Sequence, residues 1–235
     1  MPLSHIIAWL SLILATICAV VILIDIRSRP QPMKVMSFVW PLCALFGGPF
    51  LLAFYYSWGR APRSEEQGEG HHHHHGHQDT PFPISVAKGA LHCGAGCSLG
   101  DILAESLALA VPAVLVPFGY PGLFSEKIFA AWGLDFVFAF VIGVVFQYFA
   151  IVPMRNLSPG RGIVEALKAD TLSLISWQVG MYGAMAIGQF LILDEPVEPN
   201  MVMFWFIMQF AMIAGFITAY PTNWLLIRRS IKEEM

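Results

Sequence analysis

The sequence predicts an all-α, polytopic membrane protein, a helical bundle of about six transmembrane helices made of an N-terminal hairpin and a four-helix core. Two observations predict this class. Hydrophobic residues make up 57% of the 235 residues and charged residues only 12%, against about 25% charged in an ordinary soluble domain. The apolar residues also fall into blocks of about 20, the length that a helix needs to cross a hydrocarbon core of about 30 Å.

The N-terminal hairpin, residues 1–58, contains the first two predicted spans. The first covers about 6–24 and ends where charged residues and Pro30 follow. No basic residue precedes it, and its apolar run is longer than the core of a signal peptide, so we expect a retained span. The second covers about 35–58, with Trp and Tyr near both ends, as is typical of residues at a membrane interface.

Residues 59–87 are predicted to form a flexible loop, because they are polar, rich in Gly and Pro, and lack an apolar period. Imidazoles bind zinc, copper and nickel, so we expect the histidines of this loop to collect or sense metal ions. The alternative is a neutral polar linker. The histidines concerned are His71, His72, His73, His74, His75 and His77.

The four-helix core, residues 88–235, holds the remaining spans, joined by turns rich in Pro and Gly. If all six segments cross, nine Lys and Arg lie on the side of the N-terminus and four on the other, which places both termini in the cytoplasm. The basic turn after the first span argues against this locally. A re-entrant third segment, with the N-terminus outside, is the alternative to six crossings. The core spans cover about 90–118, 128–152, 166–193 and 201–227.

The third span carries a row of polar side chains at a constant spacing of four: Cys93, Cys97, Asp101 and Glu105. Residues four apart are stacked neighbours on a helix, so the row faces one direction and rises about 18 Å. His92 stands about 100° away from Cys93 and can close a site at the thiol end. The length of the row predicts a path rather than a point site.

Carboxylates are costly in hydrocarbon, so they usually face a bundle interior and mark an ion or proton path. Without a cation, desolvation favours their neutral form, whereas a metal ion favours the ionised form and releases protons. Thiolate and imidazole ligands suit copper and zinc. The row therefore predicts movement of such a cation in exchange for protons. In the alternative interpretation, the cysteines only pack in the core and the carboxyl groups form hydrogen bonds with neighbouring helices.

A second row runs beside the first: Gly96, Gly100, Ala104 and Ala108. Small residues at this spacing allow a neighbouring helix to approach the backbone closely. We therefore expect the third span to be an inner helix of the core.

Other polar and sulfur-containing residues lie in the last two spans. Asp170 shares one helix face with Met181 and is expected to face the polar row, although neutralisation of Lys168 at the interface is equally consistent. Met181, Met208 and Met212 are candidate soft ligands for Cu⁺, with core filling as the preferred interpretation.

Three segments carry a resemblance to a known family. HCGAGCSLGD at 92–101, ALKADTLSLISWQVGM at 166–181 and GFITAYPTNWLLIRRSIKEEM at 215–235 resemble the signatures of a bacterial multi-pass family, domain of unknown function 4396. The resemblance covers about residues 88–235. It implies a four-helix core in the bacterial inner (cytoplasmic) membrane and supplies no function.

The function expected from the residues is binding and transport of copper or zinc, rather than catalysis, since no Walker loop, serine-nucleophile motif, HExxH or nucleic-acid-binding stripe is present. The expected partners are lipid and the metal ion, and not nucleic acid; a homo-oligomer stays open. One alternative is a membrane redox protein or enzyme that uses the Cys93/Cys97 pair with haem or a quinone. Another is a structural or assembly subunit without a bound ion.

Overall fold

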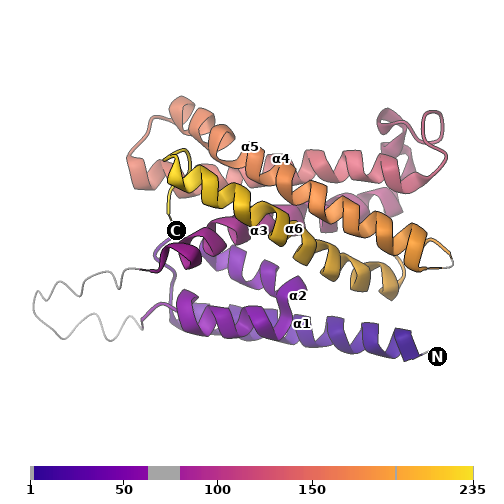
Figure 1. The fold of residues 1–235 in the computed structure, drawn as a ribbon, viewed down its shortest axis with the longest axis horizontal. Coiled ribbons are helices and arrows are strands. Elements are labelled where there is room, and N and C mark those ends of the chain that lie inside the picture. Colours follow the sequence, from indigo (N-terminus) through magenta and orange to yellow (C-terminus); the bar gives the residue numbers. More distant parts are fainter. Residues whose placement is uncertain (1–2, 63–79, 194, 235) are drawn as a thin grey trace, which may run out of the picture.

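The computed structural model describes residues 3–62, 80–193 and 195–234, and the regular structure in these ranges is helical. The predicted all-α membrane bundle is confirmed (Figure 1). A short π-helical turn extends the second and the fifth helix, as η1 (Tyr55–Gly59) and η4 (Gly188–Ile192), and a 3-10 helix, η3 (Pro112–Phe118), follows the third. The long helices are α1 (Leu3–Ser28), α2 (Met36–Phe54), α3 (Phe82–Ala110), α4 (Lys127–Arg155), α5 (Pro159–Ile187) and α6 (Val202–Arg228).

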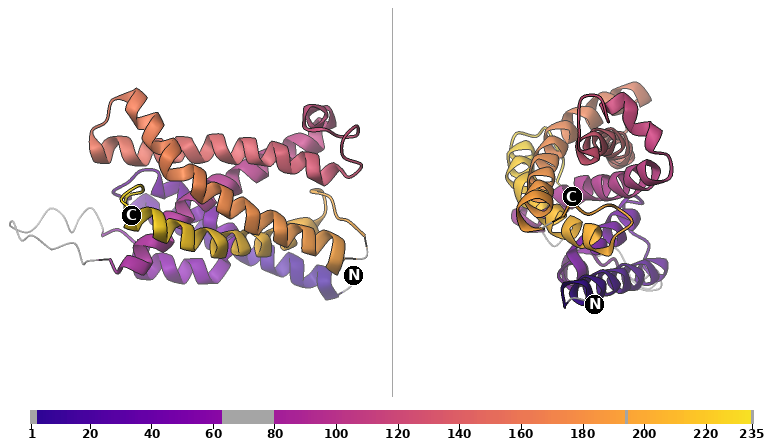
Figure 2. Two further views of the ribbon diagram at one scale, coloured as in Figure 1. Left: turned by 45° about the horizontal axis from the view of Figure 1, so that its top comes forward. Right: turned by 90° about the vertical axis from the view of Figure 1, so that its right-hand side faces the viewer.

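Helices α3 to α6 form the core of the bundle. α3 packs along α4, and α5 packs along α6. α1 and α2 pack on each other beside this core, and they reach it through α3 and α6 (right-hand view of Figure 2). One hydrophobic cluster joins residues of α1 and α2 with residues of α3 to α6.

α5 differs from the other helices in composition. By length and hydropathy, α1, α2 with η1, α3, α4 and α6 can each cross a membrane, and α5 is absent from that set. Its first half carries four charged residues, yet Asp170 and Gln178 are buried while Leu172 and Val179 are exposed. Polar residues inside and apolar residues outside are the expected pattern for a helix that faces lipid and lines a polar interior. α5 also runs the length of the bundle beside α6 (Figure 1).

α2 does not run through the bundle, because it turns back on itself at Gly48. The backbone of Gly48 has φ 50° and ψ −134°, a region open to glycine and strained for other residues. The returning half brings Phe54 and Tyr55 onto Trp40, with ring centroids 5.8 and 5.5 Å apart. α2 therefore enters and leaves at the same end, and α1 and α3 to α6 are the long helices that run between the two ends of the bundle. The re-entrant segment is the second one, not the third.

The break in α2 leaves a backbone carbonyl that neighbouring helices satisfy. In a continuous helix the carbonyl of Leu45 would accept from the N–H of residue 49, but Pro49 has none. Gln209 Nε2 of α6 donates to Leu45 O at 2.8 Å, and Ser11 Oγ of α1 donates to Gln209 Oε1 at 2.7 Å. Such a break at membrane depth is tolerated where protein surrounds it.

Two predicted boundaries shift, both at prolines. α3 begins at Phe82, inside the stretch expected to be a loop, because Pro83 lies in the first turn, where its missing N–H is no loss. The predicted third span, which was expected to reach 118, ends as an α-helix at Ala110. Pro112 then starts the 3-10 helix η3.

Basic residues gather at one end of the bundle. The sequence has 13 Lys and Arg, of which Arg63 lies outside the described ranges, leaving twelve. Only Lys127, at the start of α4, is at the end where α1 begins. The other eleven are at or near the end where α1 stops and α3 starts: Arg27, Arg29, Lys34, Arg60, Lys88, Arg155, Arg161, Lys168, Arg228, Arg229 and Lys232.

Candidate functional site

The polar row of α3 faces the interior of the bundle, as predicted. Cys93 and Cys97 have no exposed surface, and Asp101 and Glu105 are only 1% and 3% exposed. The adjacent His92 is also fully buried. α3 is therefore the inner helix of the core, and the side chains of its row are buried.

The row of small residues brings α3 and α4 into backbone contact. A Cβ atom at Gly96 would lie 2.9 Å from Gly143 Cα, and one at Gly100 would lie 2.6 Å from the backbone nitrogen of Ala139. Real Cβ atoms do not approach other atoms this closely. The predicted close packing is confirmed, and it presses the polar row of α3 against α4.

α4 contributes a matching row that the sequence reasoning missed. Asp135, Ala139, Gly143 and Gln147 are spaced by four and are all buried. Asp135 is 1% exposed and is the only charged residue between 128 and 152. A lone charge within an apolar span marks a functional site by default, so the signal for Asp135 was present in the sequence.

Three carboxyl groups gather at one end of the row. Glu105 and Asp135 are neighbours across α3 and α4, and Asp101 lies within electrostatic range of Asp135. No hydrogen-bond partner within the described ranges reaches either oxygen of Asp101 or of Asp135. A cavity of about 100 Å³ connects Glu105 with the exposed Glu126 and Glu198 at the end of the bundle. The carboxyl cluster is therefore reached from that end.

Asp170 and the thiols form the other part of the row. The buried Asp170 lies beside Cys93 and against α4, where a Cβ atom at Gly143 would be 2.5 Å from Asp170 Oδ2. The expected approach of Asp170 to the row is thus present in the structure. His92 points elsewhere, because its ring packs edge-on against Phe146 of α4 with centroids 6.2 Å apart.

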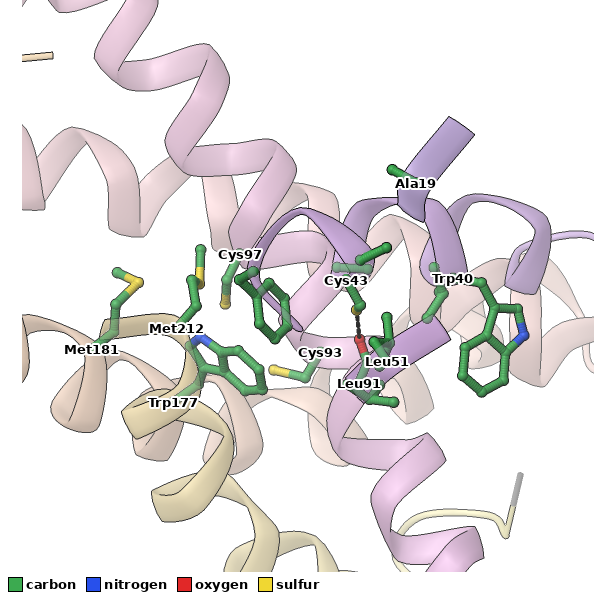
Figure 3. Packing of buried hydrophobic residues seen from close by; sticks show 14 of the residues in the cluster. Ala19, Trp40, Cys43, Leu51, Leu91, Cys93, Cys97, Trp177, Met181 and Met212 are labelled. Carbon is green, nitrogen blue, oxygen red and sulfur yellow. Dashed lines mark hydrogen bonds between the residues drawn. The ribbon is translucent and has the colours of Figure 1, made fainter. Parts of the chain in front are cut away.

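All four cysteines are free and buried. In Figure 3, Cys93 and Cys97 lie around the ring of Trp177 together with Met212, and Met181 lies farther along the same core. Cys43, on the re-entrant α2, donates from Sγ to Leu91 O at 3.2 Å (dashed line in Figure 3). The tip of α2 therefore lies close to the thiol part of the row.

A lateral cavity of about 300 Å³ opens onto the middle of the row between α1, α2, α3 and α6. Ser98 and Asp101 are its polar wall on α3, and Met208 and Met212 line it from α6. The structure thus places two of the three candidate methionines beside Asp101. Met181 is not among the lining residues and fills the core.

The donor atoms do not form one compact metal site. Nowhere in the described ranges do three His, Cys, Asp or Glu side chains converge as a metal-binding group. Buried polar groups without hydrogen-bond partners nevertheless carry a large desolvation cost. Within the same ranges these include both nitrogens of His92 and both oxygens of Asp101, Asp135 and Asp170. The histidines of residues 71–77 lie outside the described residues.

The fold and this row define a class, an integral membrane protein with a re-entrant helix and a buried polar path. The chain belongs to the family described as domain of unknown function (DUF4396), whose model matches residues 85–232, as the resemblance predicted. The match begins within α3 and ends at Lys232, so it contains both polar rows and Asp170. No curated protein and no solved structure matches the chain.

Proposed function

We propose that the protein is a transporter that binds a transition-metal cation, copper or zinc, and moves it along the polar row of α3 in exchange for protons. The observation that carries the proposal is the buried row itself, from Cys93 to Glu105, with Asp135 and Asp170 added from α4 and α5. Carboxyl groups in such an interior that have no cation beside them stay protonated until a metal ion replaces the protons. A divalent ion that releases two protons leaves the charge of the interior unchanged.

The re-entrant α2 supports transport over a purely structural role. Broken helices at membrane depth occur in transporters beside their binding sites, where freed backbone groups line a cavity. Here the broken segment contributes Leu45 and Phe46 to the cavity that exposes Ser98 and Asp101. The row therefore has lateral access in its middle and a second cavity at Glu105.

The order of ligands along the row suits a cation that passes from soft to hard donors. Thiol and thioether sulfur atoms prefer Cu⁺ and Zn²⁺, whereas carboxylates bind divalent ions more weakly. We place the protein in the bacterial inner membrane, with the basic end of the bundle in the cytoplasm. The thiols are then nearer the cytoplasmic side and the three carboxyl groups nearer the outer side.

The test is flux through the full-length protein in liposomes, with a zinc-sensitive dye inside and a pH dye reporting protons. Zn²⁺ uptake is expected to drive protons out, and the same assay is repeated with Cu⁺. Asp101→Asn and Asp135→Asn are each expected to lower the flux about tenfold or more, the effect of about 1.4 kcal/mol on a barrier. Glu234→Gln is the matched control, because that carboxylate is exposed at the end of the chain.

Flux no greater than that of empty liposomes, for both metals, would contradict transport. In that case a chromophore in the purified protein, or turnover that depends on Cys93 and Cys97, would favour the redox alternative. Normal flux in both Asn variants would show that metal moves by a route other than the row.

A further inference from the structure

The end of the chain turns back into the bundle and buries a lysine. After α6 stops at Arg228, Ser230 adopts a left-handed backbone with φ 55°, and Lys232 N donates to Leu226 O at 3.3 Å. The side chain of Lys232 has no exposed surface. Glu233, the next residue, pairs with Arg155 of α4 and holds the tail in place. Lysine is almost never fully buried unless its charge is paired, so this burial asks for a physical reason.

Oxygen atoms of α3 and α5 contact the ammonium group, and an oxygen atom of α6 lies near the same glycine of α3. Lys232 Nζ donates to Gly89 O of α3 at 3.1 Å and lies 3.9 Å from Asp170 Oδ1 of α5. Asn223 of α6 is nearby: a Cβ atom at Gly89 would lie 3.7 Å from Asn223 Oδ1 and 3.8 Å from Lys232 Cε. Asn223 Nδ2 donates to Ser173 Oγ at 2.7 Å, which orients the amide and leaves Oδ1 with no partner among the described residues. A carboxylate, a carbonyl and an amide oxygen are ligands for hard cations, and the thiol of Cys93 beside Asp170 adds a ligand that suits Zn²⁺.

The pair of Lys232 and Asp170 is loose. Charge-assisted hydrogen bonds of this kind are usually about 2.7–2.9 Å long, whereas the distance here is 3.9 Å. A buried ion pair is stabilising only when its geometry is good, and an unpaired buried charge is more costly still. Lys232 therefore compensates the charge of Asp170 without saturating its oxygens, and Cys93 lies beside the same carboxylate.

We propose that Gly89 O, Asp170 and Asn223 Oδ1 form a cation-binding site, and that Lys232 is a tethered cation that fills it until a metal ion displaces it. The inference rests on the proposed function, because the displacing ion is the transported one. Zn²⁺ arriving beside Cys93 takes the carboxylate, and the ammonium group leaves with the tail. Because one cation replaces another, Asp170 is never left as an uncompensated buried charge.

The first experiment measures zinc affinity of the full-length protein in mild detergent. Lys232→Gln removes the tethered competitor and is expected to tighten zinc binding about tenfold or more. The reason is that the apparent affinity for zinc is lowered by the fraction of molecules in which Lys232 occupies the site. Lys168→Gln is the matched control, since Lys168 is exposed on α5, two residues from Asp170, and pairs with Glu165. The Cys93→Ser/Cys97→Ser double variant supplies the background from the histidine-rich segment in every titration.

The second experiment uses the wild-type chain, so it tests the displacement of Lys232 even if the Lys232→Gln variant does not fold. An amine-reactive reagent and peptide mass spectrometry report whether Lys232 is accessible, with Lys168 as the exposed reference in the same sample. Lys232 is expected to be protected without zinc and to react when zinc is added. A merely structural anchor would stay protected in both conditions.

The outcomes separate the two proposals. Equal zinc affinity in the wild type and Lys232→Gln, with Lys232 protected throughout, overturns the tethered cation and leaves the transporter proposal intact. Zinc binding that never exceeds the background of the double cysteine variant, in either protein, removes the proposed function and this inference together. Tighter binding in Lys232→Gln with zinc-dependent labelling of the wild type supports both.

Discussion

Asp135 and Lys232 are both buried charged residues, but only the position of Asp135 can be predicted from the sequence. Asp135 is an isolated charge in an apolar span, so its functional position follows from the sequence alone. Lys232 lies among exposed charged residues in the tail, and its burial follows only from the turn at Ser230. Its contact with Gly89 spans 143 positions of the chain. No local pattern predicts a contact of that range.

Gln209 is a residue whose role can be tested by stability. Gln209→Leu removes the donor to Leu45 O and the acceptor of Ser11 Oγ, so a partly buried carbonyl loses its partner. We expect a loss of about 1–3 kcal/mol in the free energy of unfolding, measured by denaturation in detergent. Ser11→Ala keeps the bond to Leu45 O and should cost less. Equal stability of the two variants would show that the carbonyl finds another partner.

At the scale of elements, α3 and α2 show which features of a helix the sequence pattern predicts and which it does not. The spacing of four predicts the polar row and the small row of α3, because helical periodicity places such residues on fixed faces. α2 and η1 together have the length and hydropathy of an ordinary span, 24 residues. Gly48 next to Pro49 is a position where this helix can break. The direction of the chain after the break depends on its tertiary contacts with Gln209 and Trp40. Periodicity therefore predicts faces, while the path of a broken helix depends on tertiary contacts.

The α3–α4 contact gives a prediction at this scale. Gly100→Ala would place Cβ 2.6 Å from Ala139 N and 2.7 Å from Ala139 Cα, and backbone atoms cannot move aside as a side chain does. We expect overpacking to cost about 1–3 kcal/mol in the free energy of unfolding. Gly183→Ala in α5 is the control, because that position is exposed and no atom lies within 4 Å of its added Cβ. A thermal melt in detergent that does not distinguish the two variants would contradict the close packing.

For the whole molecule, the return of α2 changes how the basic residues are distributed. Six crossings divide the Lys and Arg nine against four, whereas the structure places eleven of the twelve in the described ranges at one end. The positive-inside rule is far better satisfied by the second arrangement. The basic turn after α1, which conflicted with six crossings, then lies on the same side as the other basic residues.

Topology can be decided by cysteine labelling in intact cells with a membrane-impermeant maleimide, since the four native cysteines are buried. With five crossings the N-terminus is outside, so Ser4→Cys is expected to react; with six crossings it is inside and protected. Ser125→Cys, between α3 and α4, is outside in both arrangements, and Ser230→Cys is inside in both. These two variants calibrate the assay, and protection of Ser4→Cys beside a reactive Ser125→Cys would restore the six-crossing topology. Reactivity of Ser125→Cys with protection of Ser230→Cys would place the Lys232 end of the polar row, with its tethered ammonium, on the cytoplasmic side.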